Sequence, residues 1–465
     1  MSGVLLSTVP SAVRSFNPNL GQLYLASSLR RNGIEVRLLD LASVYGACDV
    51  SCIEAAIDDQ EPEVLGFTLL TETALYAYDL ISSLGYRRDL FLVAGGPHAT
   101  SEPKEVLEQG FDVVVLGEGE ETIVELVQQL RSGGSISDVA GVAWLDESGQ
   151  LQRSSQRTQI KDIDLLSSPL DVIDLIDKER YVATGMPLLP PIITSRGCPG
   201  RCTFCSNNVS GKEYRFHSPE RVIDEVRAWQ EGEGATSVFF QDTAFTAHKK
   251  RTLELCRQLE DLPSPLSWIC KSRCDQLDRE LALAMVEGGC SSVFFGVESG
   301  SDEVLERVGK GQSVHDVEKA VEIAFEAGLN VYVHFMVGFP GETVEELEDT
   351  CVLMERLAPF VKGYPTGGIL LPYPGTTIYQ SQHEQLSCTK WWLDRERIEC
   401  INVAKRGPGE ATPTSVDDVI ALHAAIENAF LEAEVLSYSP DVKAAIKQCL
   451  SVRRDLNRQL MEKLA

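Results

Sequence analysis

The chain has little positive charge for its length. Its 465 residues include 42 Lys and Arg against 69 Asp and Glu, which gives a formal net charge of −27 with neutral histidines. A balance of this kind repels phosphate backbones and anionic lipid surfaces. We therefore expect neither a nucleic-acid partner nor a membrane partner.

Long apolar runs are missing as well. The N-terminal sequence MSGVLLSTVP has no basic segment, and its apolar run is shorter than a signal peptide or a membrane-spanning helix requires. The 13 cysteines are odd in number and show no disulfide framework, which is typical of a reducing compartment. These absences favour a cytoplasmic location.

The chain is too long for one ordinary hydrophobic core, and its first part has a regular pattern. Residues 1–135 alternate amphipathic segments with five short apolar runs, which are VLLSTV, EVRLLD, VLGFTL, LFLVAG and VVVLG. This alternation predicts an α/β domain of the doubly wound, Rossmann-like type, with helices on both faces of a parallel sheet. Ligands bind beyond the carboxyl ends of such strands, where the glycine-rich turns 95–98 and 117–120 lie.

A second alternation follows a polar connector at 136–190, which includes one extra strand near 142–145. Residues 191–375 contain six expected strands, PIITS, SVFFQ, LSWICKS, SVFFGVES, NVYVHFMVG and GGILL. Helices are expected between them near 219–230, 249–260, 278–287, 315–327 and 343–358. Six units suit a partial (β/α)6 barrel of the TIM type better than a closed eightfold one. Residues 376–465 are expected to be mostly helical, with a loop at KRGPGEATPT.

Three cysteines fall close together just after the first barrel strand, at the spacing C-x3-C-x2-C: Cys198, Cys202 and Cys205. The carboxyl ends of barrel strands are where this architecture carries chemistry. Structural zinc normally takes four ligands, and no fourth stands nearby. A [4Fe–4S] cluster is held by cysteine thiolates, and three of them leave one iron open. The spacing favours a cluster as the metal site, with zinc and ordinary core cysteines as alternatives.

Two further pairs have the C-x3-C spacing but gain no third cysteine. These pairs are Cys48 with Cys52 and Cys270 with Cys274. We interpret them as ordinary buried or half-buried residues, because free cysteine is among the most frequently buried residue types.

The cysteine motif, with Phe204 just before its last cysteine, resembles the radical S-adenosylmethionine (SAM) superfamily. The resemblance implies that SAM chelates the open iron of a [4Fe–4S] cluster. Reduction of that cluster then cleaves SAM to a 5′-deoxyadenosyl radical, which abstracts hydrogen from an unactivated carbon. The cofactor would perform the difficult step, and the protein would bind and orient the reactants.

Segments that resemble this superfamily end successive barrel strands: QDT at 241–243, Arg273, GVESG at 296–300, GFPGET at 338–343 and LPYPGT at 371–376. Each alone reads as an ordinary turn or helix cap, and only their joint occurrence favours a functional role. By resemblance, the expected SAM-binding residues are Phe204, Gln241, Asp242, Arg273, Glu298, Ser299, Gly338, Phe339 and Pro340.

The order of a doubly wound domain, a connector and this barrel resembles the cobalamin (B12)-binding branch of the superfamily. The segments that resemble this branch are NLGQLYLA at 19–26, GFT at 66–68, GGPH at 95–98 and GEGEET at 117–122. By resemblance, the expected cobalamin-binding residues are Thr68, Gly95, Gly96, Pro97, His98, Gly117, Glu118, Gly119 and Glu120. A domain that only scaffolds the barrel remains the alternative.

No histidine lies in the D-x-H-x-x-G motif that supplies a lower axial ligand to cobalamin. His98 is therefore read as a residue of the turn, with axial ligation as the alternative. The GEGEET segment lacks G-x-G-x-x-G and places acids where a pyrophosphate would lie, which argues against a dinucleotide site.

The resemblance implies a cobalamin-dependent enzyme that methylates an unactivated carbon of a small metabolite or natural-product intermediate. The alternatives are a non-methylating radical SAM reaction, such as dehydration, rearrangement, ring contraction or oxidation, and a non-enzymatic iron–sulfur protein. The expected partners are a small-molecule substrate and an electron donor such as flavodoxin, ferredoxin or a reductase. No general acid or base is identified. Trp391 and Trp392 either close over the substrate or pack on the barrel, and packing is favoured.

Overall fold

A computed structural model of the chain describes most of its residues. The described residues are 3–9, 17–41, 50–85, 90–177, 189–365, 368–385, 388–399, 421, 424, 427–428, 431 and 435–463. The chain divides into two compact units, one of residues 1–188 with 206–211 and one of residues 189–205 with 212–465. The short segment 206–211 thus belongs to the first unit, although it directly follows the last cysteine of the triplet.

The first unit is built on a sheet whose strand order is β2-β1-β3-β4-β5-β6-β7. The first five strands are parallel: β1 (Val4–Thr8), β2 (Val36–Leu39), β3 (Val64–Thr68), β4 (Phe91–Gly95) and β5 (Val113–Val115). This order reverses direction beside β1, as doubly wound sheets do. The last two strands, β6 (Val142–Leu145) and β7 (Leu151–Arg153), are antiparallel. The extra strand at 142–145 is confirmed, and its hairpin partner was not predicted.

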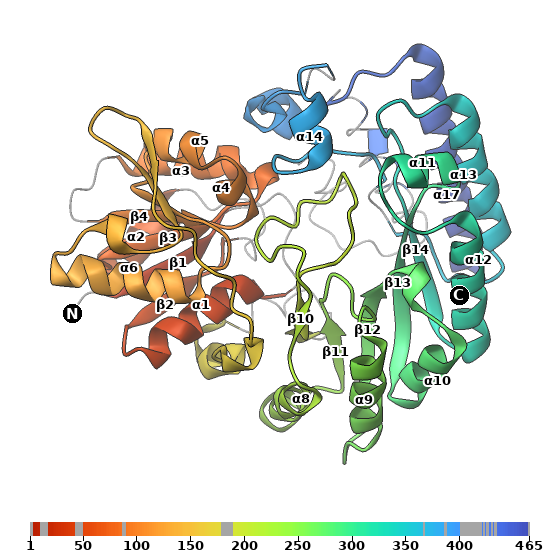
Figure 1. The fold of residues 1–465 in the computed structure, drawn as a ribbon, viewed down its shortest axis with the longest axis horizontal. Helices are drawn as coiled ribbons and strands as arrows, with labels where there is room; N and C mark the ends of the chain where they lie inside the picture. Colours follow the sequence, from red (N-terminus) through yellow and green to blue (C-terminus); the bar gives the residue numbers. More distant parts are fainter. Residues whose placement is uncertain are drawn as a thin grey trace. The chain divides into compact units, whose positions relative to one another are not determined.

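Helices cover both faces of this first sheet, with α3, α4 and α5 on one face and α1 and α6 on the other (Figure 1). Their bounds are α1 (Leu20–Arg31), α2 (Val50–Gln60), α3 (Ala74–Leu84), α4 (Pro97–Ser101), α5 (Pro103–Glu108) and α6 (Glu120–Ser132). The Asn19 side chain caps α1 by accepting a 3.1 Å hydrogen bond from the Gln22 backbone. The connections from β4 to α4 and from β5 to α6 carry the predicted glycine-rich turns.

The second unit is built on a parallel sheet with the order β14-β13-β12-β11-β8. Its strands are β8 (Pro191–Ile192), β11 (Ser237–Phe240), β12 (Ser267–Ser272), β13 (Cys290–Glu298) and β14 (Asn330–Phe335). A short antiparallel pair, β9 (Ser195–Arg196) with β10 (Arg215–Phe216), stands beside it. The predicted sixth strand, GGILL, is present in the described residues only as an isolated bridge from Ile369 to Val337, and a second bridge joins Gly363 to Tyr332.

The helices of the second unit confirm the five predicted barrel helices. They are α8 (Pro219–Glu233), α9 (Lys249–Glu260), α10 (Arg279–Glu287), α11 (Asp302–Arg307), α12 (Val314–Ala327), α13 (Val344–Leu357), α14 (Thr377–Gln382) and α17 (Pro440–Glu462). Capping boxes start α12 at Ser313 and α13 at Thr343. Within the described residues, every helix is too short or too polar to cross a membrane.

The predicted fold class is confirmed: a doubly wound domain, a partial barrel and a helical C-terminal region. The finer division at residues 135, 190 and 375 stays a prediction, because the two compact units do not test it. The predicted loop KRGPGEATPT lies outside the described residues.

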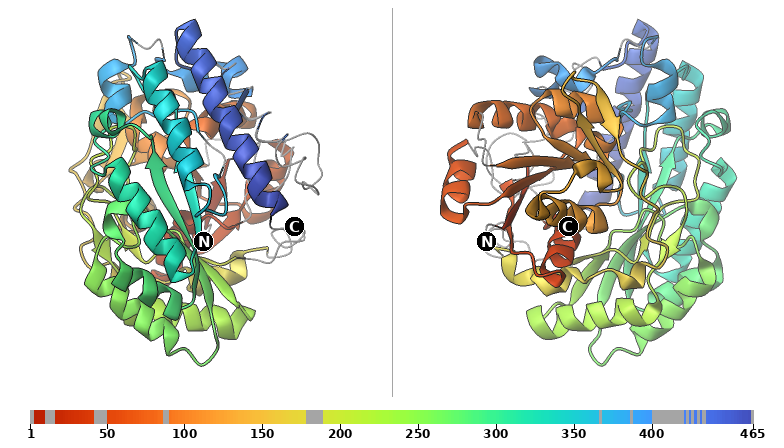
Figure 2. Two further views of the ribbon diagram at one scale, coloured as in Figure 1. Left: turned by 90° about the vertical axis from the view of Figure 1, so that its right-hand side faces the viewer. Right: turned by 60° about the vertical axis from the view of Figure 1, so that its left-hand side comes forward.

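The long helix α17 packs along α13 (Figure 2) and also substitutes for a missing strand neighbour. Asn457 on α17 is buried, and its side chain accepts a 2.8 Å hydrogen bond from the Tyr364 backbone N–H and donates one of 2.8 Å to the Tyr364 carbonyl. Both backbone groups of Tyr364 are thus satisfied by one side chain.

We predict that Asn457→Ala lowers the free energy of unfolding by about 2–4 kcal/mol, because two buried backbone groups lose their partners. Urea unfolding followed by circular dichroism measures this loss. Gln459→Ala on the exposed face of the same helix is the matched control, with an expected change within about 0.5 kcal/mol. Equal effects of the two substitutions would contradict the role assigned to Asn457.

Candidate functional site

The cysteine loop follows β9 and lies at the carboxyl end of the second sheet. The Cys198 Sγ accepts a 3.4 Å hydrogen bond from the Gly200 backbone N–H. A Cβ at residue 200 would lie 3.3 Å from the Cys198 Sγ and 3.8 Å from the Cys202 Sγ, so Gly200 sits between these two thiols. Cys205 is exposed, yet desolvation by the surrounding protein and the neighbouring Cys202 and Cys198 raise its pKa to about 11.

The loop rests on the segment 308–311. The Thr203 backbone N–H donates a 2.9 Å hydrogen bond to the Val308 carbonyl. Gly309 has φ +64°, and a Cβ there would lie 2.9 Å from the Arg201 carbonyl oxygen. The close approach of the two backbones therefore requires glycine at this position.

Lys310 joins this segment to two strand ends. Its ammonium donates to the Glu298 carboxylate at 2.7 Å, at the end of β13, and both side chains are largely buried. Burial opposes the charge on Lys310, but Glu298 and Cys202 keep its pKa above the ordinary value. The ammonium also lies 6.0 Å from the centre of the Phe204 ring, which packs 5.6 Å from the Phe339 ring.

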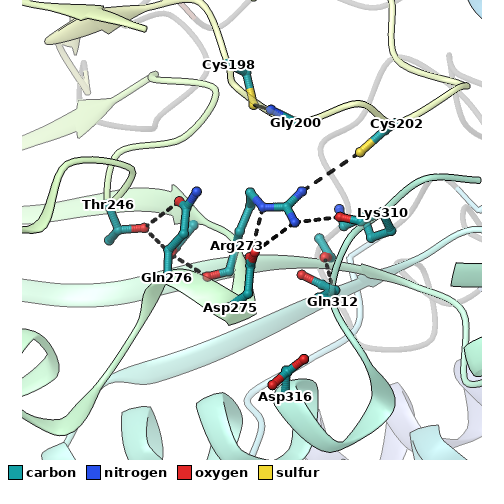
Figure 3. Close-up of polar contacts among 12 residues, drawn as sticks. Cys198, Gly200, Cys202, Thr246, Arg273, Asp275, Gln276, Lys310, Gln312 and Asp316 are labelled. Atoms are coloured by element: carbon teal, nitrogen blue, oxygen red, sulfur yellow. Dashed lines mark hydrogen bonds and ion pairs between the residues drawn. The ribbon is translucent and has the colours of Figure 1, made fainter. Parts of the chain in front are cut away.

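Arg273 follows β12 and points at the cysteine loop (Figure 3). Its guanidinium binds the Asp275 carboxylate through two hydrogen bonds of 2.9 and 3.0 Å. A third hydrogen bond, of 2.5 Å, goes to the Lys310 carbonyl, and the remaining nitrogen lies 3.9 Å from the Cys202 Sγ. The structure thus brings the predicted residues Arg273, Glu298 and Phe204 together at the cysteine loop.

The backbone at Glu298 is strained. This residue has φ +75°, and the register between β13 and β14 shifts between Gly296 and Glu298. A non-glycine residue with this φ costs of order 1–3 kcal/mol and persists where surrounding structure holds it. Here the ion pair with Lys310 holds the carboxylate at the strand end.

Asp242 lies at the end of β11 and is buried. Its carboxylate accepts hydrogen bonds from the Thr194 backbone N–H, at 3.1 and 3.2 Å, from the Thr194 hydroxyl at 2.9 Å and from the Ser195 hydroxyl. Burial raises its pKa, and Arg251 and these donors oppose the rise. The neighbouring Gln241 is half-buried, and within the described part of the chain its side chain has no hydrogen-bond partner.

Ser299 and the turn 338–343 are tied to α13 and to the C-terminal region. The Ser299 hydroxyl is buried 3.2 Å from the Thr350 hydroxyl. The Glu342 carboxylate accepts hydrogen bonds from the backbone N–H groups of Gly338 and Phe339, at 2.5 and 3.0 Å. Pro340 is half-buried in the same turn. The Tyr438 hydroxyl donates a 3.1 Å hydrogen bond to the Gly338 carbonyl and so ties the turn to the C-terminal region.

The predicted cobalamin residues all lie at the carboxyl ends of β3, β4 and β5. Thr68 ends β3, and its hydroxyl accepts from the Gln22 amide at 3.4 Å. Gly95, Gly96 and Pro97 connect β4 to α4, and Gly117, Glu118, Gly119 and Glu120 connect β5 to α6. The structure therefore brings these turns to one edge of the first sheet.

His98 is fully buried inside the first unit. Its Nε2 lies 3.0 Å from the Tyr78 hydroxyl, and its Nδ1 lies 3.3 Å from the Thr71 hydroxyl. The Tyr78 hydroxyl donates to the Glu105 carboxylate at 3.0 Å, and burial and Glu105 raise the pKa of Tyr78 well above its ordinary value. This network uses both ring nitrogens within the domain, as a residue that holds the turn would.

A cavity of about 390 Å³ opens beside the second glycine-rich turn. Its lining includes Gly117, Glu118, Thr100, Ser154, Thr158 and Asn208. Asn208 belongs to the segment that follows the cysteine triplet, and its amide donates to the Pro97 carbonyl at 2.7 Å and to the Ser101 hydroxyl at 2.5 Å. Leu116, Ile160 and Val209 also line the cavity, so its wall is both polar and apolar.

The donor set fits an iron–sulfur cluster. Three thiols share one loop, a backbone N–H faces one sulfur, and Arg273 faces another, which are the contacts by which proteins tune such clusters. Among the described residues, however, no three His, Cys, Asp or Glu side chains already converge as a metal site.

The structure also tests the predictions for the other cysteine pairs and for the two tryptophans. Cys270 and Cys274 are buried, as predicted. Cys52 is exposed, so the prediction of burial was wrong there, because α2 turns this side chain to solvent; Cys48 lies outside the described residues. Trp391 and Trp392 are buried, and the Trp391 indole donates to the Pro372 carbonyl at 2.9 Å, which supports the packing interpretation.

The sequence reasoning missed Lys310, Gln312 and Asn208. Gln312 donates to the Gly296 carbonyl at 3.1 Å, beside the Lys310 ion pair. The run GKGQ at 309–312 was the available signal, because a lysine between two glycines follows a helix at the same edge of the sheet. Asn208 lies three residues after Cys205 and belongs to no motif.

Comparison with family models supports both domains. Residues 192–354 match the model of the radical SAM superfamily, and residues 7–127 match that of the B12 binding domain.

Among curated proteins, the chain is 34% identical over 379 residues to an uncharacterized methyltransferase of Pyrococcus horikoshii, covering 80% of each protein. It is 25% identical to the anaerobic magnesium-protoporphyrin IX monomethyl ester cyclase of Cereibacter sphaeroides, covering 78% of this chain and 60% of the cyclase.

Among solved structures, the fold resembles the radical SAM methyltransferase TsrM of Kitasatospora setae, solved with cobalamin and a [4Fe-4S] cluster bound. The TM-score is 0.68 at 21% identity, over 83% of this chain and 79% of that one. This likeness supports the fold.

We predict that Cys202→Ala, reconstituted anaerobically with iron and sulfide, falls from about four iron atoms per chain to less than about one. The two thiolates that remain are too few to hold the cluster that three thiolates hold. Iron and acid-labile sulfide assays measure the loss. Cys52→Ala is the matched control, because Cys52 is exposed and outside the triplet; loss of iron from this control would count against the assignment.

Glu342 generates a prediction about pH. Burial raises its pKa from 4.5 to about 7, and the Gly338 and Phe339 N–H groups only partly oppose the rise. The folded state therefore binds a proton that the unfolded state releases at lower pH, so stability from this group is full below pH 4.5 and is lost as pH rises through 7. Between pH 5 and pH 8 we expect the free energy of unfolding of the unmodified chain to fall by roughly 1–3 kcal/mol more than that of the Glu342→Gln variant. Urea unfolding at both pH values tests this, with exposed Glu345→Gln as the control.

Proposed function

The chain belongs to the radical SAM superfamily and carries its B12-binding domain, and from this premise we propose that it methylates an unactivated carbon of a small metabolite or natural-product intermediate. The observation that carries the radical SAM part is the convergence of Arg273, Glu298 and Lys310 on the cysteine loop. The methyl-transfer part is supported by the relative from Pyrococcus horikoshii that is named a methyltransferase.

Cys198, Cys202 and Cys205 would hold a [4Fe–4S] cluster, which supplies the electron for cleavage of SAM, and the first unit would hold cobalamin as the methyl carrier. The chain's own contribution is to hold the thiols on a fixed loop. Gly200 has no side chain that would crowd the Cys198 and Cys202 sulfurs. The segment 308–311 holds the loop through the hydrogen bond from the Thr203 N–H to the Val308 carbonyl. Arg273 places positive charge beside the Cys202 sulfur.

We assign the SAM contacts by the polar groups that remain available. Gln241 offers an amide that has no partner in the described part of the chain. The backbone groups of Gly338 and Phe339 are bonded to Glu342 and Tyr438, so this turn would contribute through its shape and the Phe339 ring. Arg273 and Glu298 face the loop, where they form ion pairs with Asp275 and Lys310. Asp242 acts through Thr194 and Ser195, which precede the cysteine loop, and is a positioning residue.

In the first unit, the glycine turns after β4 and β5 would lie against a corrin. A Cβ at Gly96 would lie 2.9 Å from the Leu69 carbonyl oxygen, and one at Gly119 would lie 3.1 Å from the Leu25 side chain, so glycine lets these turns pack closely at the strand ends. The cavity beside Gly117 has the hydroxyl and amide lining that corrin amide side chains need. His98 would act through the turn it supports, since its ring is used inside the domain.

A second candidate is a radical SAM reaction without methyl transfer. The cyclase from Cereibacter sphaeroides favours it, because that relative is not named a methyltransferase. This chain spans 60% of the cyclase, so its activity carries over less directly. In either case we expect a small-molecule substrate and a low-potential electron donor of the flavodoxin, ferredoxin or reductase class.

Product analysis tests the two candidates. The full chain is reconstituted with iron, sulfide and hydroxocobalamin, then incubated anaerobically with SAM and titanium(III) citrate. We expect both 5′-deoxyadenosine and S-adenosylhomocysteine by mass spectrometry, and loss of 5′-deoxyadenosine in Cys202→Ala. Omission of cobalamin is expected to remove S-adenosylhomocysteine alone, because it removes the methyl acceptor. Formation of 5′-deoxyadenosine without S-adenosylhomocysteine would favour the second candidate. Absence of both products would contradict radical chemistry.

A further inference from the structure

One face of the second sheet is covered by helices, and the other carries partly exposed side chains. Along β12, β13 and β14 burial alternates, so that Lys271 is exposed and Phe294, Tyr332 and His334 are half-buried while their neighbours are buried. The sheet register pairs Lys271 with Phe294, Phe294 with Tyr332 and Gly296 with His334. Residues paired in this way point to the same side of a sheet. We call these four side chains the inner face.

Lys271 brings to the inner face a cation that forms no ion pair among the described residues. Its ammonium lies 5.4 Å from the centre of the Phe239 ring, and within the described residues it has neither a hydrogen bond nor an ion pair. The other cations at this end of the sheet are paired, Arg273 with Asp275 and Lys310 with Glu298. Lys271 is therefore the charge at this end that a bound anion could match.

Aromatic rings form the rest of the inner face. The rings of Phe294 and Tyr332 are stacked, with centres 4.7 Å apart and planes 11° apart, and His334 lies 6.0 Å from Phe294. Each stacked ring covers only one face of the other, so their edges and outer faces remain for a ligand. Ring edges carry partial positive charge and attract the face of a planar π system or a carboxylate. In the described part of the chain, the Tyr332 hydroxyl and the His334 ring also have no hydrogen-bond partner.

The inner face lies along the same strands as the proposed reaction site. Lys271 precedes Arg273 by two residues, and Phe294 precedes Glu298 by four. At about 3.3 Å per strand residue, these steps correspond to roughly 7 and 13 Å along the strands. A carboxylate on one or two fused rings is long enough to cover the shorter of these two distances. A Cβ at Gly296 would lie 2.7 Å from the Glu298 carboxylate and 3.0 Å from the Lys310 ammonium, so this ion pair extends back over Gly296 toward Phe294.

We propose that the inner face binds the substrate, and that the substrate is a planar, unsaturated carboxylic acid. Its carboxylate pairs with Lys271, and its ring lies across the edges of Phe294 and Tyr332 with its far end directed toward Arg273 and Glu298. The identification of the bound ligand as the substrate of a radical SAM reaction rests on the proposed function. The binding itself requires only the inner face.

The experiment measures binding of two probes to the full chain reconstituted with its cluster. The probes are 2-naphthoate and its neutral isostere 2-naphthamide, followed by saturation-transfer NMR and by fluorescence titration. We expect 2-naphthoate to bind at least tenfold more tightly than 2-naphthamide. Lys271→Met is expected to remove that preference, and Lys271→Arg is expected to keep most of it. Lys250→Met, an exposed lysine of α9, is the matched control and should keep the full preference.

Two results would overturn the inference. One is equal binding of the two probes to the unmodified chain, which does not depend on whether a variant folds. The other is an unchanged preference in Lys271→Met. Phe294→Leu is expected to weaken both probes by threefold or more, since the ring edge serves both. Failure of the proposed function would be seen separately, as absence of 5′-deoxyadenosine from the unmodified chain, and it would leave the probe result standing.

Discussion

The structure of the second unit depends on one short segment, residues 308–311, and above all on Lys310. The Lys310 ammonium holds Glu298 at the end of β13, its carbonyl holds Arg273 at the end of β12, and the carbonyl of Val308 holds the cysteine loop. A buried ion pair is costly to desolvate, and removing one partner typically costs 3–5 kcal/mol. Such a pair is therefore weak as a source of stability and strong as a constraint on geometry. Here it fixes the relative positions of two strand ends and the thiols.

The same logic explains why several expected ligand contacts turn out to be internal. Asp242 holds Thr194 and Ser195, which lead into the cysteine loop, and His98 holds Tyr78 and Thr71 beneath a glycine turn. Fully buried polar groups must be hydrogen-bonded, so they are suited to fix the backbone that meets a ligand. A site that handles a reactive radical needs such rigidity, because small displacements of the reactants cost rate.

The sequence was sufficient for most of the architecture, because strand–helix alternation is a local signal. The parallel strands of the first unit and the barrel helices followed from apolar runs and capping residues such as Ser313 and Thr343. It was insufficient where tertiary contacts decide. The GGILL strand forms only a bridge in the described residues, and the preceding Tyr364 has both backbone groups bonded to Asn457 of α17. The role of Lys310 could not be read because its partners come from three distant segments.

The charge of the chain and the charge of the inner face act over different distances. A net charge of −27 opposes the approach of an anion, but at physiological salt this repulsion is screened beyond about 8 Å. Lys271 acts at contact distance, where desolvation by the surrounding protein lowers its pKa and Asp242 opposes the change. A carboxylate that reaches the inner face would be attracted by the Lys271 ammonium at contact distance, whereas a neutral ligand would not. An acidic protein can therefore select an acidic substrate, provided that recognition takes place inside the barrel and not on its surface.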